Sequence, residues 1–540
     1  MIKICEERGH IEMSKLRVLL IMAYPQGYSI VNTRQEEIGI EYIAEVTRQR
    51  GNELILVYGD ETQIDFDEIE EFKPDIVGFT MYYNNVDRIR IVSEKLIGMF
   101  NDIIIVAGGP LATMNHKEVL QNEYTIDCVV RGEGEKTWVE LLEYIENEGD
   151  ISKVKGITYR GAGGNEIICN PDQEYIKDLD TLPFPKTNSM IEAVYISTSR
   201  GCVKNCSFCI SNKFWKRWRG RSPQKVVDEM EYLVNNNGTR YIGIVDNSFE
   251  DPDGKCTRGL EIAKEIIRRG VKVVYQVNYR AEFWKVVTPE MMDILKKSGL
   301  VAVSIGIETA NEFDRKLYNK AATVEDNYKI VEVMQSYGIH VNTNFIMFNP
   351  YSTFEGLRQN IDYLEKLNRI DWDSVSHSYM TLEGTDLYKK IKSDGLAIPS
   401  VYYNVYYSYK YKDPRMLPLS KYLYNIPHKW LDDHRHLVSG YLSCLTLDRL
   451  VYGFHEKRDK YDIVKAYEDE ARNLSNTIGR YIAKWFRNLL DIAEHGWDID
   501  KALEMEYEIM NHPKVVDSLD GLWEMALGTN AELRALREQI

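Results

Sequence analysis

The sequence predicts an α/β protein made of two successive strand–helix series and a mainly helical C-terminal region. Between residues 16 and 395, short apolar runs alternate with amphipathic helical stretches. Such alternation is typical of parallel sheets that are covered by helices. After Gly395 strand signals become rare, and we expect residues 396–540 to form a mainly helical domain, rich in tyrosine between Val401 and Tyr424.

The first series covers residues 16–149 and predicts a doubly wound, Rossmann-like domain. Its strand candidates are Arg17–Ala23, Glu53–Tyr58, Asp75–Thr80, Ile103–Gly108 and Thr125–Val130, and a helix is expected around Glu36–Arg50. Ligands of such sheets bind at the carboxyl ends of the strands. Residues 1–15 are expected to form a tail, and residues 150–191 a connector with a hairpin over Gly161–Gly164.

The second series covers residues 192–395. Its strand candidates are Ala193–Thr198, Tyr241–Asp246, Lys272–Asn278, Val301–Ile307, His340–Met347 and Trp372–Tyr379. The helical patterns between them are Pro223–Asn235, Arg258–Arg269, Pro289–Ser298, Thr323–Tyr337 and Thr353–Leu367. Six such units predict a partial (β/α)6 barrel, with its active site at the carboxyl ends of the strands.

The composition argues against several classes of protein. The formal charge of −16, from 83 acidic and 67 basic side chains, opposes general nucleic-acid binding. No apolar run approaches the roughly 20 residues that cross a membrane, so we expect a cytoplasmic protein without membrane contact. The eight cysteines are too sparse for a disulfide framework.

Three cysteines, however, stand together. Cys202, Cys206 and Cys209 have the spacing C-x3-C-x2-C directly after an apolar strand. Three thiolates on one loop can bind three irons of a [4Fe–4S] cluster and leave the fourth iron open to a cofactor or substrate. The alternatives are a zinc site, which needs a fourth ligand that no neighbouring Cys or His offers, and a chance grouping of thiols.

This spacing, after the first strand of a barrel, resembles the radical S-adenosylmethionine (SAM) superfamily. The resemblance implies that the open iron binds SAM and that reduction releases a 5′-deoxyadenosyl radical. It also implies that Phe208 lies near the adenine and that polar groups at strand ends hold the rest of SAM. The matching positions are Asp246, Arg280, Ser304, Glu308 and Asn344. Each could equally be a cap or a turn, and Glu308 is the strongest candidate.

The aromatic and basic stretch Phe214–Arg221 allows two interpretations. Tryptophans among basic residues could stack on nucleic-acid bases. The same superfamily often carries such a stretch, ending in Arg-Ser-Pro before a helix. Here Ser222 is expected to cap that helix and Pro223 to occupy its first turn.

Two glycine motifs of the first domain, Val106–Thr113 and Asp127–Glu135, resemble the cobalamin-binding domain that precedes many radical SAM barrels. Glycines let the backbone approach a large flat corrin. The resemblance implies a cobalamin site formed by Thr80, Met81, Tyr82, Tyr83, Gly108, Gly109, Pro110, Gly132, Glu133 and Gly134.

The pattern Asp-x-His-x-x-Gly, which supplies a histidine ligand to cobalt in the methionine-synthase type, does not occur in the sequence. His116 stands in Asn115–Lys117 without that pattern. We therefore expect base-off cobalamin without a histidine ligand, its lower face covered by the loop Met81–Asn85.

The resemblance implies a methyltransferase that delivers the methyl group of methylcobalamin to an unactivated carbon of a small molecule or peptide. An external electron donor of the flavodoxin or ferredoxin type is then required. A cyclisation, ring contraction or rearrangement with the same cofactors is the main alternative. A corrinoid or redox sensor would not need the barrel, and RNA modification would call for a basic domain that residues 395–540 do not provide.

Overall fold

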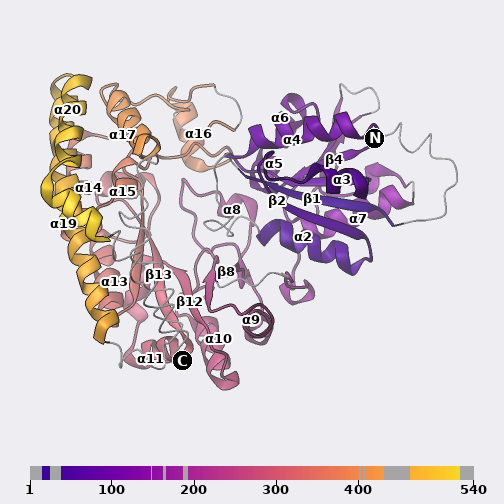
Figure 1. The fold of residues 1–540 in the computed structure, drawn as a ribbon, viewed down its shortest axis with the longest axis horizontal. Helices are drawn as coiled ribbons and strands as arrows, with labels where there is room; N and C mark the ends of the chain where they lie inside the picture. Colours follow the sequence, from indigo (N-terminus) through magenta and orange to yellow (C-terminus); the bar gives the residue numbers. More distant parts are fainter. Residues whose placement is uncertain are drawn as a thin grey trace.

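The structure of the protein is a computed structural model. It describes residues 15–24, 38–147, 149–161, 166–186, 193–399, 403–405, 408–430 and 462–522. Figure 1 shows two α/β units side by side and a group of helices at the far edge of the second unit. Almost the whole predicted tail and the tip of the predicted hairpin lie outside the described residues.

The N-terminal sheet has seven strands in the order β2-β1-β3-β4-β5-β6-β7. Its parallel strands are β1 (Arg17–Ala23), β2 (Glu53–Gly59), β3 (Ile76–Thr80), β4 (Ile104–Gly108) and β5 (Cys128–Val130). The order reverses direction between β1 and β3, and ligands bind at such a switch point. The expected hairpin, β6 (Ile157–Arg160) and β7 (Ile167–Cys169), pairs antiparallel with β5 and so extends this sheet.

Helices cover both faces of this sheet (Figure 1). They are α2 (Ile38–Gln49), α3 (Phe66–Phe72), α4 (Val86–Met99), α5 (Gly109–Met114), α6 (His116–Asn122) and α7 (Gly134–Glu146). Two separate apolar clusters fill the sheet's two sides, because alternate residues of β1, such as Leu19 and Leu20, pack to opposite faces. The doubly wound fold is therefore confirmed.

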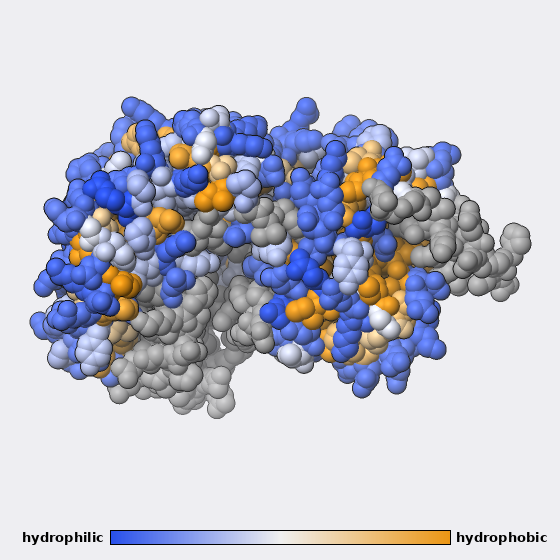
Figure 2. All heavy atoms as spheres, turned by 90° about the horizontal axis from the view of Figure 1, so that it is seen from above, coloured by the Kyte–Doolittle hydropathy of each residue, from blue (hydrophilic) through white to orange (hydrophobic). Residues whose placement is uncertain are grey.

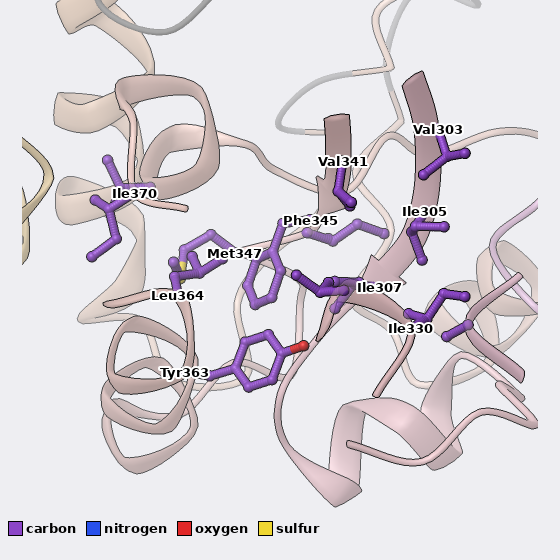
Figure 3. Close-up of a cluster of buried hydrophobic side chains, with 14 of the residues drawn as sticks. Val303, Ile305, Ile307, Ile330, Val341, Phe345, Met347, Tyr363, Leu364 and Ile370 are labelled. Carbon is purple, nitrogen blue, oxygen red and sulfur yellow. The ribbon is translucent and has the colours of Figure 1, made fainter. Parts of the chain in front are cut away.

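The second sheet consists of five parallel strands in sequence order, β8 (Ala193–Ile196), β11 (Tyr241–Ile244), β12 (Val274–Tyr279), β13 (Leu300–Glu308) and β14 (His340–Phe345). The connecting helices are α9 (Pro223–Asn237), α10 (Thr257–Arg269), α11 (Pro289–Ser298), α12 (Glu312–Leu317), α13 (Val324–Ser336) and α14 (Phe354–Lys366). Ile307, Phe345 and Tyr363 meet in the apolar core between this sheet and its helices (Figure 3).

The sixth predicted barrel strand is wrong. Residues Trp372–Ser376 form the short helix α15, and only Ser378 makes a parallel bridge, to Phe348 after β14. The reason is local: the Asp371 side chain accepts a hydrogen bond from Ser374 N at 2.7 Å, and Ser374 Oγ accepts one from Asp371 N at 3.0 Å. These reciprocal bonds start a helical turn.

The described part of the C-terminal region is helical, as expected. It contains α17 (Met416–Trp430), α19 (Asp462–His495) and α20 (Ile499–Met510), and α16 (Asp386–Ser393) precedes it at the end of the predicted barrel region. Helix α19 packs on α14, with ion pairs from Arg358 to Asp491 at 2.8 Å and from Arg487 to Asp362 at 2.6 Å. None of the described helices is long and apolar enough to cross a membrane. Figure 2 shows a mainly hydrophilic face with several small apolar patches.

Candidate functional site: a cavity beside the cysteine loop

A cavity lies where the carboxyl ends of the N-terminal strands face the second sheet. Its walls come from both units: Gly78, Gly108 and Gly132 from the first, and Arg200 and Trp215 from the second. Gly109 at its edge has a φ of +92°, and a Cβ there would lie 2.9 Å from Thr80 Oγ1. Only glycine fits, so a ligand can reach the bare backbone.

Most of the predicted cobalamin residues line this cavity. They are Thr80, Tyr82, Gly108, Gly109, Pro110, Gly132, Glu133 and Gly134. Two do not. Met81 is fully buried in the core of the N-terminal domain, and Tyr83 is half-buried and packs against that same core. Both are removed from the set of cavity residues.

Asn85 gives the loop after β3 its shape. Its buried amide donates hydrogen bonds to Ala23 O at 3.1 Å and Thr80 O at 3.0 Å, and its Oδ1 accepts one from Tyr82 N at 2.8 Å. The loop therefore holds Tyr82 at the cavity. His116 does not line the cavity and instead lies 3.0 Å from Thr158 Oγ1.

The cysteine loop follows the short strand β9 (Ser199–Arg200), which pairs with β10 (Arg219–Gly220). Gly201 has a φ of +90°, and a Cβ there would lie 2.4 Å from Arg217 O. Beyond it the loop is held through its backbone, because Ser207 N donates to Tyr318 O at 2.9 Å and Asn319 Nδ2 donates to Asn205 O at 2.8 Å. These bonds leave the three thiol groups available as ligands.

The thiols of Cys202, Cys206 and Cys209 are half-buried and close enough to influence one another electrostatically. Burial raises the pKa of Cys206 to about 11, although the nearby Lys320 ammonium acts in the opposite direction. In the described chain no three His, Cys, Asp or Glu side chains converge as ligands of a single ion would. A cubane makes a different demand, one thiolate for each of three irons, and this loop fits it.

Two of the predicted SAM contacts, Asp246 and Arg280, have several partners within the protein. Asp246 is 1% exposed, and its carboxylate accepts hydrogen bonds from Thr198 N at 2.7 Å and from Ser199 N at 2.8 Å. Arg280 binds Ser248 Oγ at 3.0 Å and Glu250 at 3.2 Å. Asp246 thus binds the residues just before the cysteine loop, and Arg280 binds residues of the loop after β11. These bonds reduce the capacity of both side chains for a SAM contact, and both assignments stay predictions.

Glu308 remains a candidate. It ends β13 with a φ of +70°, a strained conformation for a residue with a side chain. Burial raises the pKa of its carboxyl group, and the Lys320 ammonium opposes that shift. Both groups act on the Cys206 thiol, so they lie beside the cysteine loop. Lys320 was missed because it stands in a loop outside any motif.

The remaining candidates also lie at this end of the sheet. Ser304 is in register between Asn278 and Asn342, on the face of the sheet opposite its buried apolar residues. Asn344 is exposed. Phe208 makes an edge-to-face contact with Tyr318, with the ring centroids 5.3 Å apart, and so packs against the core.

The basic stretch 214–221 has structural contacts. Trp215 and Phe214 line the cavity, Arg219 binds Glu133 at 2.7 Å, and Arg221 forms an ion pair with Glu229. Ser222 caps α9 as expected, by accepting a hydrogen bond from Lys225 N at 3.3 Å. These contacts disfavour the nucleic-acid interpretation.

The protein has a three-cysteine loop at the carboxyl end of a parallel barrel sheet. This loop lies next to a glycine-lined cavity of a doubly wound domain. The two features together define the class of corrinoid-dependent radical SAM enzymes. The comparisons agree. The sequence model of the Radical SAM superfamily matches residues 196–364, and that of the B12 binding domain matches residues 31–142. The chain belongs to the radical SAM enzymes that carry a B12-binding domain.

Among curated relatives, an uncharacterized methyltransferase of Pyrococcus horikoshii is 26% identical over 66% of this chain and 79% of its own. The anaerobic magnesium-protoporphyrin IX monomethyl ester cyclase of Cereibacter sphaeroides is 30% identical over 57% of this chain and 50% of its own. The chain thus spans about half the length of that cyclase.

Two solved structures share the fold. The cobalamin-dependent SAM radical enzyme OxsB, with aqua-cobalamin and SAM bound, has a TM-score of 0.65 and 16% identity over 95% of this chain and 84% of its own. The radical SAM methyltransferase TsrM from Kitasatospora setae has a TM-score of 0.58 and 19% identity over 71% and 76%.

Proposed function

We propose that the chain is a methyltransferase acting on an unactivated carbon of a small molecule or peptide. The observation that carries the proposal is the cavity shared by the two domains. Gly132–Gly134 line it from the N-terminal domain, and Arg200, two residues before Cys202, lines it from the barrel. A substrate at this cavity reaches both cofactor sites.

In this proposal Cys202, Cys206 and Cys209 hold the cluster, and the cavity residues hold the corrinoid. When bound, the cluster gives SAM the electron that releases a 5′-deoxyadenosyl radical, and the corrinoid supplies the methyl group. Glu308 offers an acceptor to the ribose hydroxyls or the ammonium group of SAM, and Lys320 a positive charge to its carboxylate. Ser304, Asn344 and Phe208 complete the SAM site.

The protein contributes position and exclusion of water. The walls of Leu20, Val106 and Trp138 keep the depth of the cavity apolar. Reacting groups held in such a place gain from proximity rather than from acid–base catalysis. We also propose a cytoplasmic location and an electron donor of the flavodoxin or ferredoxin type, as the family resemblance implies.

Cyclisation or rearrangement is the second candidate. It is favoured by the cyclase relatives, which are 28% and 30% identical, and by 4′-phospho-dehydrooxetanocin synthase of Priestia megaterium at 24%. Those reactions would use the same two cofactor sites.

Incubation of anaerobically reconstituted protein with SAM, a reductant and candidate substrates separates the two. Methyl transfer by this route consumes two SAM molecules, so 5′-deoxyadenosine and S-adenosylhomocysteine should form in about equal amounts. The triple variant C202A/C206A/C209A is the control and should form no 5′-deoxyadenosine. Product with 5′-deoxyadenosine but without S-adenosylhomocysteine would establish the second candidate instead.

A further inference from the structure

Four charged side chains form a buried ion network between the two domains, which we name the clamp: Glu133, Glu135, Arg200 and Arg219. Arg200 Nη1 lies 2.8 Å from Glu133 Oε1, and Arg200 Nη2 lies 2.5 Å from Glu135 Oε1. Arg219 Nη1 lies 2.7 Å from Glu133 Oε2. The four side chains are at most 11% exposed.

The barrel half of the clamp depends on the N-terminal half. Arg200 and Arg219 stand directly opposite each other in the β9–β10 ribbon. Like charges opposite one another destabilise a strand pair, and burial of unpaired charges adds to that penalty. Glu133 binds both guanidinium groups, and Glu135 binds that of Arg200. The two carboxylates and the two guanidinium groups have formal charges that sum to zero. Without these carboxylates, the ribbon would hold two buried cations without acidic partners from the other domain.

The clamp also joins the two cofactor loops. Glu133 stands between Gly132 and Gly134 of the cavity, and Arg200 is followed by Gly201 and Cys202. Glu133 has little capacity left for a ligand. Its Oε1 accepts from Arg200 and Arg219 at 2.8 and 2.9 Å, and its Oε2 accepts from Arg219 and Ile176 N at 2.7 and 2.9 Å.

We propose that the clamp is a positioning device that sets the distance between the corrinoid and the cluster. This inference rests on the proposed function only in its assignment of the two cofactors to these two loops. The substrate carbon must meet both the radical and the methyl donor, and displacements near 1 Å can lower such rates about 100-fold. A rigid link between the two loops would keep the two cofactor sites at a fixed separation.

The test is a distance measurement. Pulsed electron paramagnetic resonance on protein carrying cob(II)alamin and the reduced cluster reports the distribution of their separation. Arg219→Gln removes one barrel cation without altering the cavity wall, and Glu135→Gln removes one carboxylate. The matched control is Glu123→Gln, because Glu123 is 2% exposed and pairs with Arg90 at 2.7 Å within the N-terminal domain.

The wild type and Glu123→Gln should show one narrow distribution, and both clamp variants a broadened or shifted one. With substrate, the clamp variants should release at least about tenfold more 5′-deoxyadenosine per product, because the radical is formed but misplaced. Glu135→Gln keeps the test available if Arg219→Gln does not fold.

Unchanged distributions in both clamp variants would overturn the inference. So would a loss of corrinoid affinity in Glu133→Gln that Arg219→Gln does not share, because Glu133 would then be a cofactor ligand. The distance measurement needs no turnover, so an enzyme that transfers no methyl group would still test the clamp. Failure of the wild type to bind corrinoid or cluster would instead contradict the cofactor assignments of the proposed function.

Discussion

The candidate carboxylates differ in how many hydrogen bonds they already accept from the protein. Asp246 and Glu133 are buried, and both oxygens of each accept hydrogen bonds from the protein. Glu308 is half-buried, and among the described residues Lys320 is the charged neighbour that lowers its pKa. A carboxylate with unused acceptor capacity beside an open cluster site is the better candidate for a ligand contact.

The two neighbouring tyrosines of the β3 loop should behave differently. Tyr82 lines the cavity, whereas Tyr83 lies outside it: Tyr83 is half-buried, packs against the core of the N-terminal domain, and has a buried hydroxyl group near Glu383 and Tyr379. In Tyr82→Ala we expect water to reach the lower face of cobalt and the paramagnetic resonance spectrum of cob(II)alamin to change. Tyr83→Ala should keep the wild-type spectrum and lose about 1–2 kcal/mol of stability, because the side chain is half-buried.

His116→Ala is the control for axial ligation. His116 bonds to Thr158 outside the cavity, so its loss should leave the cob(II)alamin spectrum unchanged. Nitrogen superhyperfine splitting that disappears in this variant would show that the histidine is a cobalt ligand after all. An altered spectrum in Tyr83→Ala would contradict the orientation of the loop.

At the scale of elements, the sequence predicts buried parallel strands well because each is a short apolar run between polar ends. β1, for example, begins and ends at the expected residues. The sixth barrel strand fails because the segment 372–379 is no continuous apolar run: its three apolar residues are spaced three and four apart, as on one face of a helix. The capping pair Asp371 and Ser374 then starts a helical turn.

The candidate site also has parts that the sequence predicts and parts that it does not. The cysteine spacing is local, so the sequence is sufficient to predict it. Lys320 and the partners of Glu133 are not local: Lys320 reaches the cysteine loop through the fold, and Arg200 meets Glu133 across 67 positions of sequence. Such contacts follow from the packing of the two domains, which no single motif encodes.

The start of α13 carries a pH-dependent cap. Asp326 and Thr323 form a capping box, and Asp326 also accepts a hydrogen bond from Lys285 at 2.8 Å. Burial alone would raise the pKa of Asp326, but these donors outweigh it and lower the pKa from 3.8 to about 2. Asp326→Asn should therefore cost about 1 kcal/mol at pH 7, as loss of a cap does.

The sign of the pH effect follows from the lowered pKa. A carboxylate with a folded-state pKa below its unfolded value stabilises the fold above about pH 4 and loses that contribution as the pH falls toward 2. Denaturant unfolding of wild type and Asp326→Asn should thus differ at pH 7 and converge below pH 4. A difference independent of pH would show that the cap acts through shape rather than charge.

At the scale of the whole molecule, the shared cavity couples the docking of the two domains to ligand binding. Residues of both domains form its wall, so a ligand that fills it stabilises the docked arrangement. A ligand at a free concentration 100 times its dissociation constant stabilises the state that binds it by about 2.7 kcal/mol. The clamp is the path by which that stabilisation reaches the cysteine loop, because Arg200 belongs to both the cavity wall and the β9–β10 ribbon.

Hydrogen exchange measures this coupling directly. Addition of hydroxocobalamin to the cofactor-free protein should slow amide exchange in residues 132–135. It should also slow exchange in the ribbon of Ser199–Arg200 and Arg219–Gly220, because the ribbon opens less often when the clamp carboxylates bind its arginines. Helix α19 packs on α14 at the far edge of the barrel and should exchange as before, which makes it the internal control. In Arg219→Gln the protection of residues 132–135 should persist while that of the ribbon is lost, since the corrinoid still binds but no longer reaches the cysteine loop. Protection that never extends beyond the N-terminal domain would mean that the two domains respond to the corrinoid independently.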